Sequence, residues 1–330
     1  MTTADTSSDS LADTAADLDA RVRSTVAAEQ GVTTGALETL PGGHSGLTYR
    51  ATAGEGSIVV KAVPPGQRPI GRHDMLRQAR IMAALAGSGV PVPAIRAIDE
   101  VEPAWFAMEL VEGESLEPVL DSPAVEPDLA AARMRRAADL MPRLHAVDLA
   151  TLPIDAPALT PADELGRWVR TMGAVPPELV PAAAEVQRLL EASVPAPVPP
   201  VLVHGDYRLG NIIARGAEPV ALIDWEIWAA GDPRVELGWF AVFADGGNFP
   251  GVGRQVDGLP GVDELLERYA DGGPALPDFT WFDALGRFKM AAIMGHNLRR
   301  HREGRHHDPD QEQLPATIER LLSTALDRLR

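Results

Sequence analysis

Two short apolar segments on either side of a polar loop constrain the fold of this chain more than any other feature. The first reads VLVH over residues 201–204, and the second reads PVALIDW over residues 219–225. The loop between them holds Asp206 and Asn211, and the second segment carries Asp224 near its end. Both segments predict strands. Because a loop and an adjoining strand end can meet at one point, we expect these three side chains to form one site.

Phosphoryl transfer is the chemistry that these side chains fit. The reaction needs a positioned hydroxyl, a nearby base and metal ions that neutralise phosphate oxygens. Magnesium prefers oxygen ligands, carboxylates above all. The kinase catalytic and metal-binding loops have a fixed order of residues: an Asp, four further residues, an Asn, and then an Asp on the next strand. The pattern predicts Asp206 as the base and Asn211 and Asp224 as Mg²⁺ ligands; the alternative is a polar turn with a capping Asp.

A nucleotide would meet further predicted residues earlier in the chain. Lys61 lies in the apolar segment IVVKAV, where it predicts a phosphate contact; a lysine on an edge strand with its amine in water is the alternative. A glycine-rich turn precedes it and could cover the triphosphate. Its candidate residues are Gly42, Gly43, His44 and Ser45. The segment MELVEG ends the last predicted strand of this half and could offer backbone groups to a purine through Met108, Glu109 and Val111.

The pattern along the chain predicts two lobes. Residues 1–112 predict a β-rich lobe of five strands and a helix over 72–86, after a disordered stretch (1–15) and a helix over 17–30. The five predicted strands cover 37–40, 47–52, 57–63, 95–98 and 105–110. Residues 113–330 predict a mainly helical lobe, with helices over 130–146, 264–269, 281–302 and 313–329.

Composition excludes several classes of protein. The net charge of −17 argues against a nucleic-acid-binding surface, and the absence of cysteine removes disulfides and zinc–thiolate sites. The first residues lack the pattern of a signal peptide, and no apolar run is long enough to span a bilayer. We therefore expect a cytoplasmic protein that binds neither nucleic acid nor membrane.

Several motifs together resemble one known family. They are GGHSGLTYR, VVK, MELVEG, HGDYRLGN, IDWE and GDP, spread over nearly the whole chain after about residue 20. The chain resembles the aminoglycoside phosphotransferase-like kinases, and within them the kinase-like domains that precede certain acyl-CoA dehydrogenases. The resemblance implies an α+β, protein-kinase-like fold with a small antiparallel β lobe and a larger helical lobe. It also implies ATP or GTP with Mg²⁺ and a small-molecule hydroxyl acceptor.

The same motifs extend the list of candidate site residues. The resemblance implies Asp206 as base, Asn211 and Asp224 as magnesium ligands and Lys61 on the phosphates. From the same segments we place His204 with the catalytic residues and Arg208 and Glu226 with the acceptor-binding residues.

Two positions depart from the family pattern. Gln78 stands where the family has a glutamate that pairs with the strand lysine, so Lys61 is expected to be held less firmly. Glu236 stands where relatives have aspartate, and its longer side chain should still accept hydrogen bonds.

The acceptor is left open by the sequence. A basic cluster near the C-terminus predicts an anionic acceptor bound by Arg299 and Arg302, while a solvated helix end is the alternative. A metal site at His301, His306, His307 and Asp308 is a weaker alternative. The acceptor is either an aminoglycoside-type antibiotic or a hydroxy acid or hydroxyacyl thioester. A nucleotide-binding pseudokinase is the second class of function, favoured only by Gln78.

Overall fold

A computed structural model describes residues 6–40, 47–64, 74–270 and 276–330. The chain divides into two compact units. The first comprises residues 1–112 and 221–227, and the second comprises residues 113–220 and 228–330. The predicted glycine-rich turn at 42–45 lies outside the described residues.

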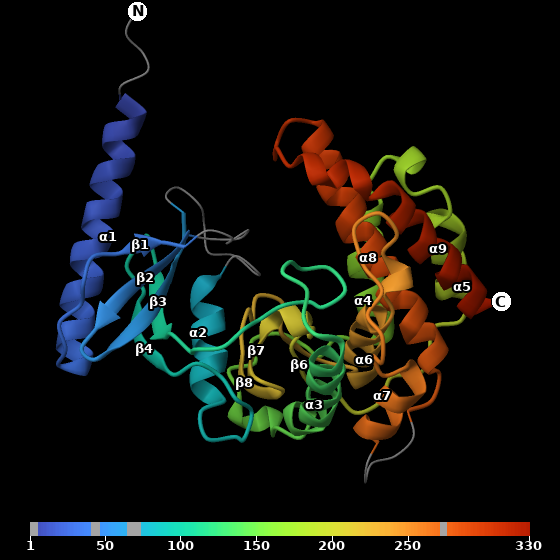
Figure 1. The fold of residues 1–330 in the computed structure, drawn as a ribbon, viewed down its shortest axis with the longest axis horizontal. Helices are drawn as coiled ribbons and strands as arrows, with labels where there is room; N and C mark the ends of the chain where they lie inside the picture. The colour runs from blue at the N-terminus through green and yellow to red at the C-terminus, as the bar shows by residue number, and fades with distance from the viewer. Residues whose placement is uncertain (1–5, 41–46, 65–73, 271–275) are drawn as a thin grey trace, which may run out of the picture. The chain divides into compact units, whose positions relative to one another are not determined.

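A five-stranded antiparallel sheet forms the centre of the first unit (Figure 1). Its order is β1-β2-β3-β5-β4, so the first three strands form a meander and β5 lies between β3 and β4. The strands are β1 (Glu38–Thr39), β2 (Leu47–Ala53), β3 (Gly56–Ala62), β4 (Ile95–Asp99) and β5 (Trp105–Glu109). All five strands predicted from the sequence are confirmed, with ends that shift by at most one residue.

Helix α1 (Thr6–Gln30) packs on this sheet through the apolar stripe that the sequence predicts. Leu18, Val22 and Val26 are buried in one cluster with strand residues such as Val60 and Trp105. The prediction of disorder over residues 1–15 is wrong for residues 6–15, which are helical. The reason is that this stretch is continuous with the half of the helix that is anchored on the sheet, so it extends an existing helix and needs no nucleus of its own.

Helix α2 (Met75–Ala84) carries the predicted buried face of the first unit. It begins at Met75 because the carboxylate of Asp74 accepts hydrogen bonds from the amides of Leu76 and Arg77 and so caps the helix. The predicted apolar positions, including Ala79 and Met82, are buried. The same face holds Gln78, whose side chain therefore points into the unit rather than into solvent.

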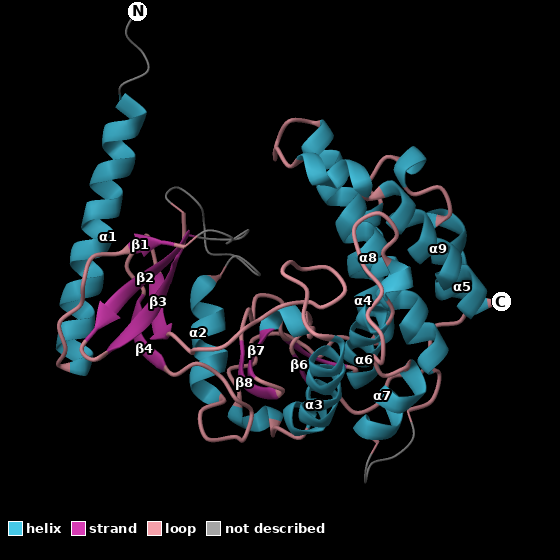
Figure 2. Cartoon of the chain, viewed as in Figure 1, coloured by secondary structure: helices cyan, strands magenta, loops and turns pink. Residues whose placement is uncertain are grey.

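The second unit is mainly helical and holds two small two-stranded sheets (Figure 2). Strands β6 (Val201–Val203) and β9 (Ala229–Gly231) pair with each other, as do β7 (Ile212–Arg215) and β8 (Glu218–Leu222). The helices are α3 (Pro127–His145), α4 (Pro161–Met172), α5 (Ala183–Ala192), α6 (Pro233–Ala241), α7 (Val262–Tyr269), α8 (Phe279–Arg302) and α9 (Pro315–Leu329). The sequence predicts α3, α7, α8 and α9 but makes no assignment for α4, α5 and α6.

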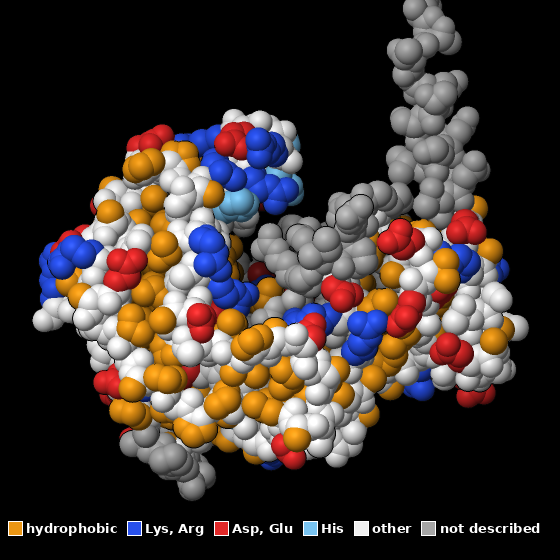
Figure 3. Space-filling model, turned by 180° about the vertical axis from the view of Figure 1, so that it is seen from behind, with side chains coloured by type: hydrophobic (Ala, Val, Ile, Leu, Met, Phe, Trp, Pro, Cys, Tyr) orange, Lys and Arg blue, Asp and Glu red, His pale blue; other side chains and the backbone are white. Residues whose placement is uncertain are grey.

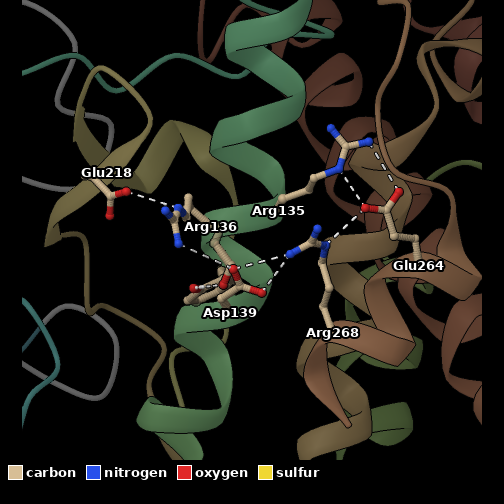
Figure 4. A network of polar contacts seen from close by, with 8 residues as sticks. Arg135, Arg136, Asp139, Glu218, Glu264 and Arg268 are labelled. Atoms are coloured by element: carbon tan, nitrogen blue, oxygen red, sulfur yellow. Dashed lines mark hydrogen bonds and ion pairs between the residues drawn. The ribbon is translucent and has the colours of Figure 1, made fainter. Parts of the chain in front are cut away.

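A surface network of ion pairs links α3 to α7 and to the start of β8 (Figure 4). Arg135 contacts Glu264 at 2.6 Å, and Arg268 contacts Asp139 at 3.1 Å. The side chains are one-third exposed or more, so each pair contributes at most about 1 kcal/mol. The network therefore assists the packing of these elements, while their apolar faces supply most of the stability.

Candidate functional site

In the first unit, the side chains of Asp224 and Gln78 meet at the ammonium group of Lys61. The Lys61 Nζ lies 2.9 Å from Asp224 Oδ1 and 3.4 Å from Gln78 Oε1. The second contact confirms that Gln78 occupies the position of the lysine's helix partner. Because the amide carries no charge, this bond is weaker than a bond from Lys61 to a carboxylate would be.

The backbone of Asp224 adopts a conformation that is unusual for its residue type. Its φ of 68° lies in the left-handed region, which few residues other than glycine enter. Its side chain is 40% exposed, so the carboxylate keeps access to solvent while it pairs with Lys61. Strained backbone of this kind persists where the surrounding structure enforces it, and it is often found at functional sites.

The remaining candidates of the first unit lie in and after β5 and in the segment around Asp224. Met108 is buried, with its backbone paired to β3 across from Val59. Glu109 forms an ion pair with Arg96 at 3.0 Å, so its side chain is occupied. Val111 follows the strand, and Glu226 is half-buried.

In the second unit, the polar loop carries the carboxylate of Asp206, which is oriented by hydrogen bonds. Its Oδ2 accepts a hydrogen bond from Asn211 Nδ2 at 2.8 Å, and its Oδ1 accepts one from Trp239 Nε1 at 3.0 Å. Arg208 Nε lies 3.6 Å from Oδ1. The side chain is still 27% exposed. A carboxylate with fixed orientation and solvent access is the arrangement that a general base requires.

The amide of Asn211 is oriented by the same loop. Its Nδ2 donates both to the Asp206 carboxylate and to the Asp206 carbonyl oxygen, at 2.9 Å in the second case. Since the nitrogen side of the amide is committed to Asp206, Oδ1 is the atom that can serve as a metal ligand. An amide oxygen is one of the donor types that Mg²⁺ accepts, beside carboxylate, phosphate and water oxygens.

His204 lies between the end of β6 and the loop. It is fully buried, and its Nδ1 accepts a hydrogen bond from the Asp206 amide at 3.2 Å. This contact fixes the backbone of the residue that carries the candidate base.

Glu236 on α6 holds the backbone of the loop. The sequence predicts that its side chain accepts hydrogen bonds, and it does so. Its carboxylate accepts hydrogen bonds from the amides of His204 at 3.0 Å and Gly205 at 2.8 Å, and it pairs with His145 Nε2 at 3.1 Å. Burial by itself raises the pKa of Glu236, but the contacts with His145 and with His204 and its amide outweigh burial and lower the pKa below its usual value.

Two buried charged residues near the loop carry no sequence signal that singles them out. Glu117 accepts a hydrogen bond from the Gly210 amide at 3.3 Å, and burial raises its pKa to about 8 although Arg208 opposes the shift. Lys289 on α8 donates to the Gly205 carbonyl oxygen. Their roles depend on contacts between residues far apart in the sequence, which no local pattern reveals.

The basic cluster lies at the C-terminal end of α8 (Figure 3). Arg302 forms a double hydrogen bond with Glu312 at 2.8 and 2.6 Å, and Arg299 donates to the carbonyl oxygen of Ala174 at 2.6 Å. Across the described ranges, no three His, Cys, Asp or Glu side chains are grouped so as to hold a metal ion by themselves. The three histidines of this segment therefore form no such site.

These features place the chain in a family of kinase-like fold. It belongs to the phosphotransferase enzyme family, whose sequence model matches residues 36–270. Mouse acyl-CoA dehydrogenase family member 10 is 28% identical over 316 residues, which cover 89% of this chain and 29% of that protein. Mouse acyl-CoA dehydrogenase family member 11 is 26% identical over 307 residues, which cover 86% of this chain and 39% of that protein. The chain thus spans well under half the length of these relatives.

Solved structures confirm the predicted fold class, a protein-kinase-like α+β fold. A protein of Ralstonia eutropha assigned to the aminoglycoside phosphotransferases has a TM-score of 0.72 and 23% identity, covering 88% of this chain and 92% of that one. Spectinomycin phosphotransferase in complex with ADP and spectinomycin has a TM-score of 0.62 and 14% identity, covering 94% and 98%. Aminoglycoside 2′-phosphotransferase-IIIa with GDP has a TM-score of 0.60 and 16% identity, covering 93% and 99%.

None of the helices within the described residues is both long enough and apolar enough to span a bilayer.

Proposed function

We propose that this protein transfers the γ-phosphoryl group of a nucleoside triphosphate to a hydroxyl group of a small molecule. The observation that carries the proposal is the state of Asp206: both carboxylate oxygens are oriented by hydrogen bonds, and the side chain keeps access to solvent. A carboxylate held in this way can accept a proton from a hydroxyl without first reorienting.

In the proposed reaction, the acceptor hydroxyl donates its proton to Asp206. The hydroxyl oxygen forms a bond to the γ-phosphorus while the bond from that phosphorus to the bridging oxygen breaks, and the nucleoside diphosphate leaves. Arg208, next to Asp206, is placed to attract the phosphoryl oxygens or an anionic group of the acceptor. His204 and Glu236 act on the loop backbone and not on the substrate.

Lys61 is the proposed contact for the α- and β-phosphates. Lys61 pairs with Asp224, so a nucleotide would take over the ammonium group. Asp224 and Asn211 Oδ1 would then hold Mg²⁺, which neutralises phosphate charge and leaves the loop to position the hydroxyl. The proposal assigns residues 1–112 to nucleotide binding, with Gly42, Gly43, His44 and Ser45 and the backbone from Met108 to Val111. It assigns residues 113–330 to the acceptor and the catalytic loop.

Both purine nucleotides stay candidates as donors, since related folds are known with ADP and with GDP. The proposal can be tested by measuring the thermal unfolding midpoint with ATP and with GTP, each with and without Mg²⁺. We expect a rise that requires magnesium and that is lost in Asp224→Ala. If neither nucleotide raises the midpoint of the wild-type protein under any of these conditions, the proposal fails.

A hydroxy acid or hydroxyacyl thioester is the acceptor class that we favour over an aminoglycoside. Two cationic side chains, Arg208 and Lys289, lie against the loop that carries Asp206, and aminoglycosides are themselves cationic. The matched region of both mouse relatives is part of a longer protein named as an acyl-CoA dehydrogenase family member. A kinase joined to such a protein is well placed to act on a related acyl compound.

For a long anionic acceptor, Arg299 and Arg302 are the proposed distal contacts. They follow Lys289 on α8 by ten and thirteen residues, which corresponds to about 15 and 20 Å along the helix. A coenzyme A thioester is long enough to extend over such a distance, whereas a small hydroxy acid is not.

Arg302→Ala is expected to raise the KM for a hydroxyacyl-CoA about fivefold and to leave kcat unchanged, because it removes one charged contact far from the reacting hydroxyl. Glu312→Gln is the matched control, since it releases Arg302 from its partner and should lower the same KM. If steady-state kinetics give the same KM for both variants and the wild-type protein, the basic cluster only stabilises the end of α8.

A catalytically weak pseudokinase is the second candidate, and the observation that favours it is the contact between Lys61 and an uncharged Gln78. Gln78→Glu is expected to tighten Mg²⁺-nucleotide binding about fivefold, because a charge-assisted bond holds Lys61 more firmly than a neutral one. Gln78→Leu, which removes the bond, should weaken binding by a similar factor. Isothermal titration calorimetry would contradict this account if all three proteins bound with one affinity.

A further inference from the structure

Lys289 is a buried lysine in the middle of α8. It is 2% exposed, and burial lowers its pKa although the acidic groups around it oppose the shift. Taking an ammonium group out of water is costly unless its surroundings compensate for the lost hydration. Its ammonium group donates to the Gly205 carbonyl oxygen and lies over the rings of Trp239 and Trp168, at 3.8 and 5.1 Å from Nζ to the ring centroids.

A close crossing of two helices puts Lys289 at this point. A Cβ added to Gly238 on α6 would lie 2.3 Å from the Phe282 carbonyl oxygen of α8, and one added to Gly286 would lie 2.5 Å from the Gly238 carbonyl oxygen. The two glycines therefore let the backbones of α6 and α8 touch. Because residues three apart share a helix face, Lys289 follows Gly286 on the face that meets α6.

Two short connections join Lys289 to the candidate base. In the first, its ammonium group holds the carbonyl oxygen of Gly205, the residue before Asp206. In the second, the ammonium lies over the ring of Trp239, whose Nε1 donates to Asp206 Oδ1. The backbone next to Asp206 and one oxygen of its carboxylate are thus both fixed by groups that Lys289 contacts.

We propose that Lys289 and Trp239 are positioning residues of the phosphotransferase site: the Lys289 ammonium fixes the Gly205 carbonyl and the Trp239 indole, and these hold Asp206 in the orientation that accepts the acceptor's proton. This inference rests on the proposed function, since it assigns Asp206 as the base. It goes beyond that function because neither residue contacts a substrate in the proposed reaction.

The charged groups around Lys289 come from three elements. Glu164 and Arg167 lie on α4, Asp206 on the loop and Glu236 on α6. The acidic groups retain the lysine proton, whereas burial and Arg167 favour its loss. Because the pKa of Lys289 is lowered, its charge is lost as pH rises at a lower pH than that of an ordinary lysine. An arginine at this position would keep its charge throughout.

The test compares Lys289→Met, Lys289→Arg and Trp239→Phe with the wild-type protein. The rate is that of γ-phosphate release from Mg²⁺-ATP or Mg²⁺-GTP with water as the acceptor, measured between pH 6 and about pH 10. Lys289→Met should lower kcat about 10²-fold, because a small displacement of the base has an effect of that size. The nucleotide KM should stay unchanged. The wild-type rate should fall at alkaline pH as Lys289 loses its charge. Lys289→Arg should recover most of the rate and should not show this fall.

A second readout does not depend on activity. The indole N–H signal of Trp239, assigned by its loss in Trp239→Phe, should exchange with deuterium faster in Lys289→Met than in the wild-type protein. Met290→Ala, a neighbouring buried substitution on α8, controls for a general loss of stability and should leave both kcat and the indole signal unchanged.

Two results would overturn the inference. If Asp206→Asn abolishes phosphate release while Lys289→Met keeps the wild-type rate and indole exchange, Lys289 only fills space in the core and the proposed function stands. If Asp206→Asn itself keeps the wild-type rate, the proposed function fails, and this inference fails with it.

Discussion

Asp206→Asn should slow γ-phosphoryl transfer roughly 10²- to 10⁴-fold, because the amide keeps the shape of the side chain but cannot accept the proton of the acceptor. Its oxygen can still accept the hydrogen bond from Trp239, whereas its NH₂ group cannot accept the bond from Asn211, which keeps its bond to the carbonyl oxygen of residue 206. Nucleotide binding should persist, since the proposed phosphate contacts are Lys61 and the magnesium ligands. The measurement is the rate of γ-phosphate release or transfer, together with the thermal unfolding midpoint at saturating nucleotide.

Asp163→Asn is a suitable control for this variant. Asp163 is an exposed carboxylate that caps α4, and its neutralisation should leave the transfer rate unchanged. An Asp206→Asn protein that keeps its fold and transfers phosphate at the wild-type rate would show that another group acts as the base.

Glu236→Gln is expected to lower the free energy of unfolding by about 3 kcal/mol at pH 7, which makes it the largest expected effect on stability. The carboxylate is 1% exposed and accepts hydrogen bonds from the amides of His204 and Gly205 while it pairs with His145. A glutamine would turn an NH₂ group toward one of these donors. Urea unfolding of the variant and the wild-type protein measures the difference.

The effect of Glu236 should also depend on pH. Because its pKa is lowered in the folded protein, its charge stabilises the fold above its unfolded pKa of about 4.5. This stabilisation is lost as pH falls through the lower, folded pKa. The difference between Glu236→Gln and the wild-type protein should therefore be largest near neutral pH and shrink below about pH 4.5.

Glu264→Gln is the matched control for charge. Glu264 is likewise a paired carboxylate, with two arginines as partners, but its side chain is 36% exposed, so its loss should cost less than about 1 kcal/mol. Equal destabilisation by the two substitutions at pH 7 would contradict the role of Glu236 as the anchor of the loop.

The sequence predicts the fold wherever a local pattern decides the structure. The four-residue spacing of Leu18, Val22 and Val26 predicts a buried helix stripe, and these residues are buried in the core of the first unit. The position of Gln78 relative to Lys61 follows from the family pattern, and the two side chains are in contact. In each case the information lies within a few residues of the feature that it predicts.

Helix α6 shows why other features could not be predicted. Nearly every residue of α6 is buried, so the segment has no polar face and no helical periodicity. Its contact with α8 through Gly238 and Gly286 joins residues far apart in the sequence. The burial of Lys289 depends on that crossing, and a lysine in a helix otherwise indicates an exposed position. The helix over residues 6–15 was missed because its polar residues suggested disorder.

The most direct test of the central claim is to follow the phosphorus atoms of Mg²⁺-ATP and Mg²⁺-GTP by ³¹P NMR. The protein would be incubated with each nucleotide and, in turn, with aminoglycosides, hydroxy acids and hydroxyacyl-CoA thioesters. The account predicts a new phosphate-ester signal, equal to the loss of the γ-phosphate signal, that appears with one acceptor class and is absent with Asp206→Asn. A protein that binds Mg²⁺-nucleotide but leaves the γ-phosphate intact with every acceptor and with water would contradict it and would favour a pseudokinase.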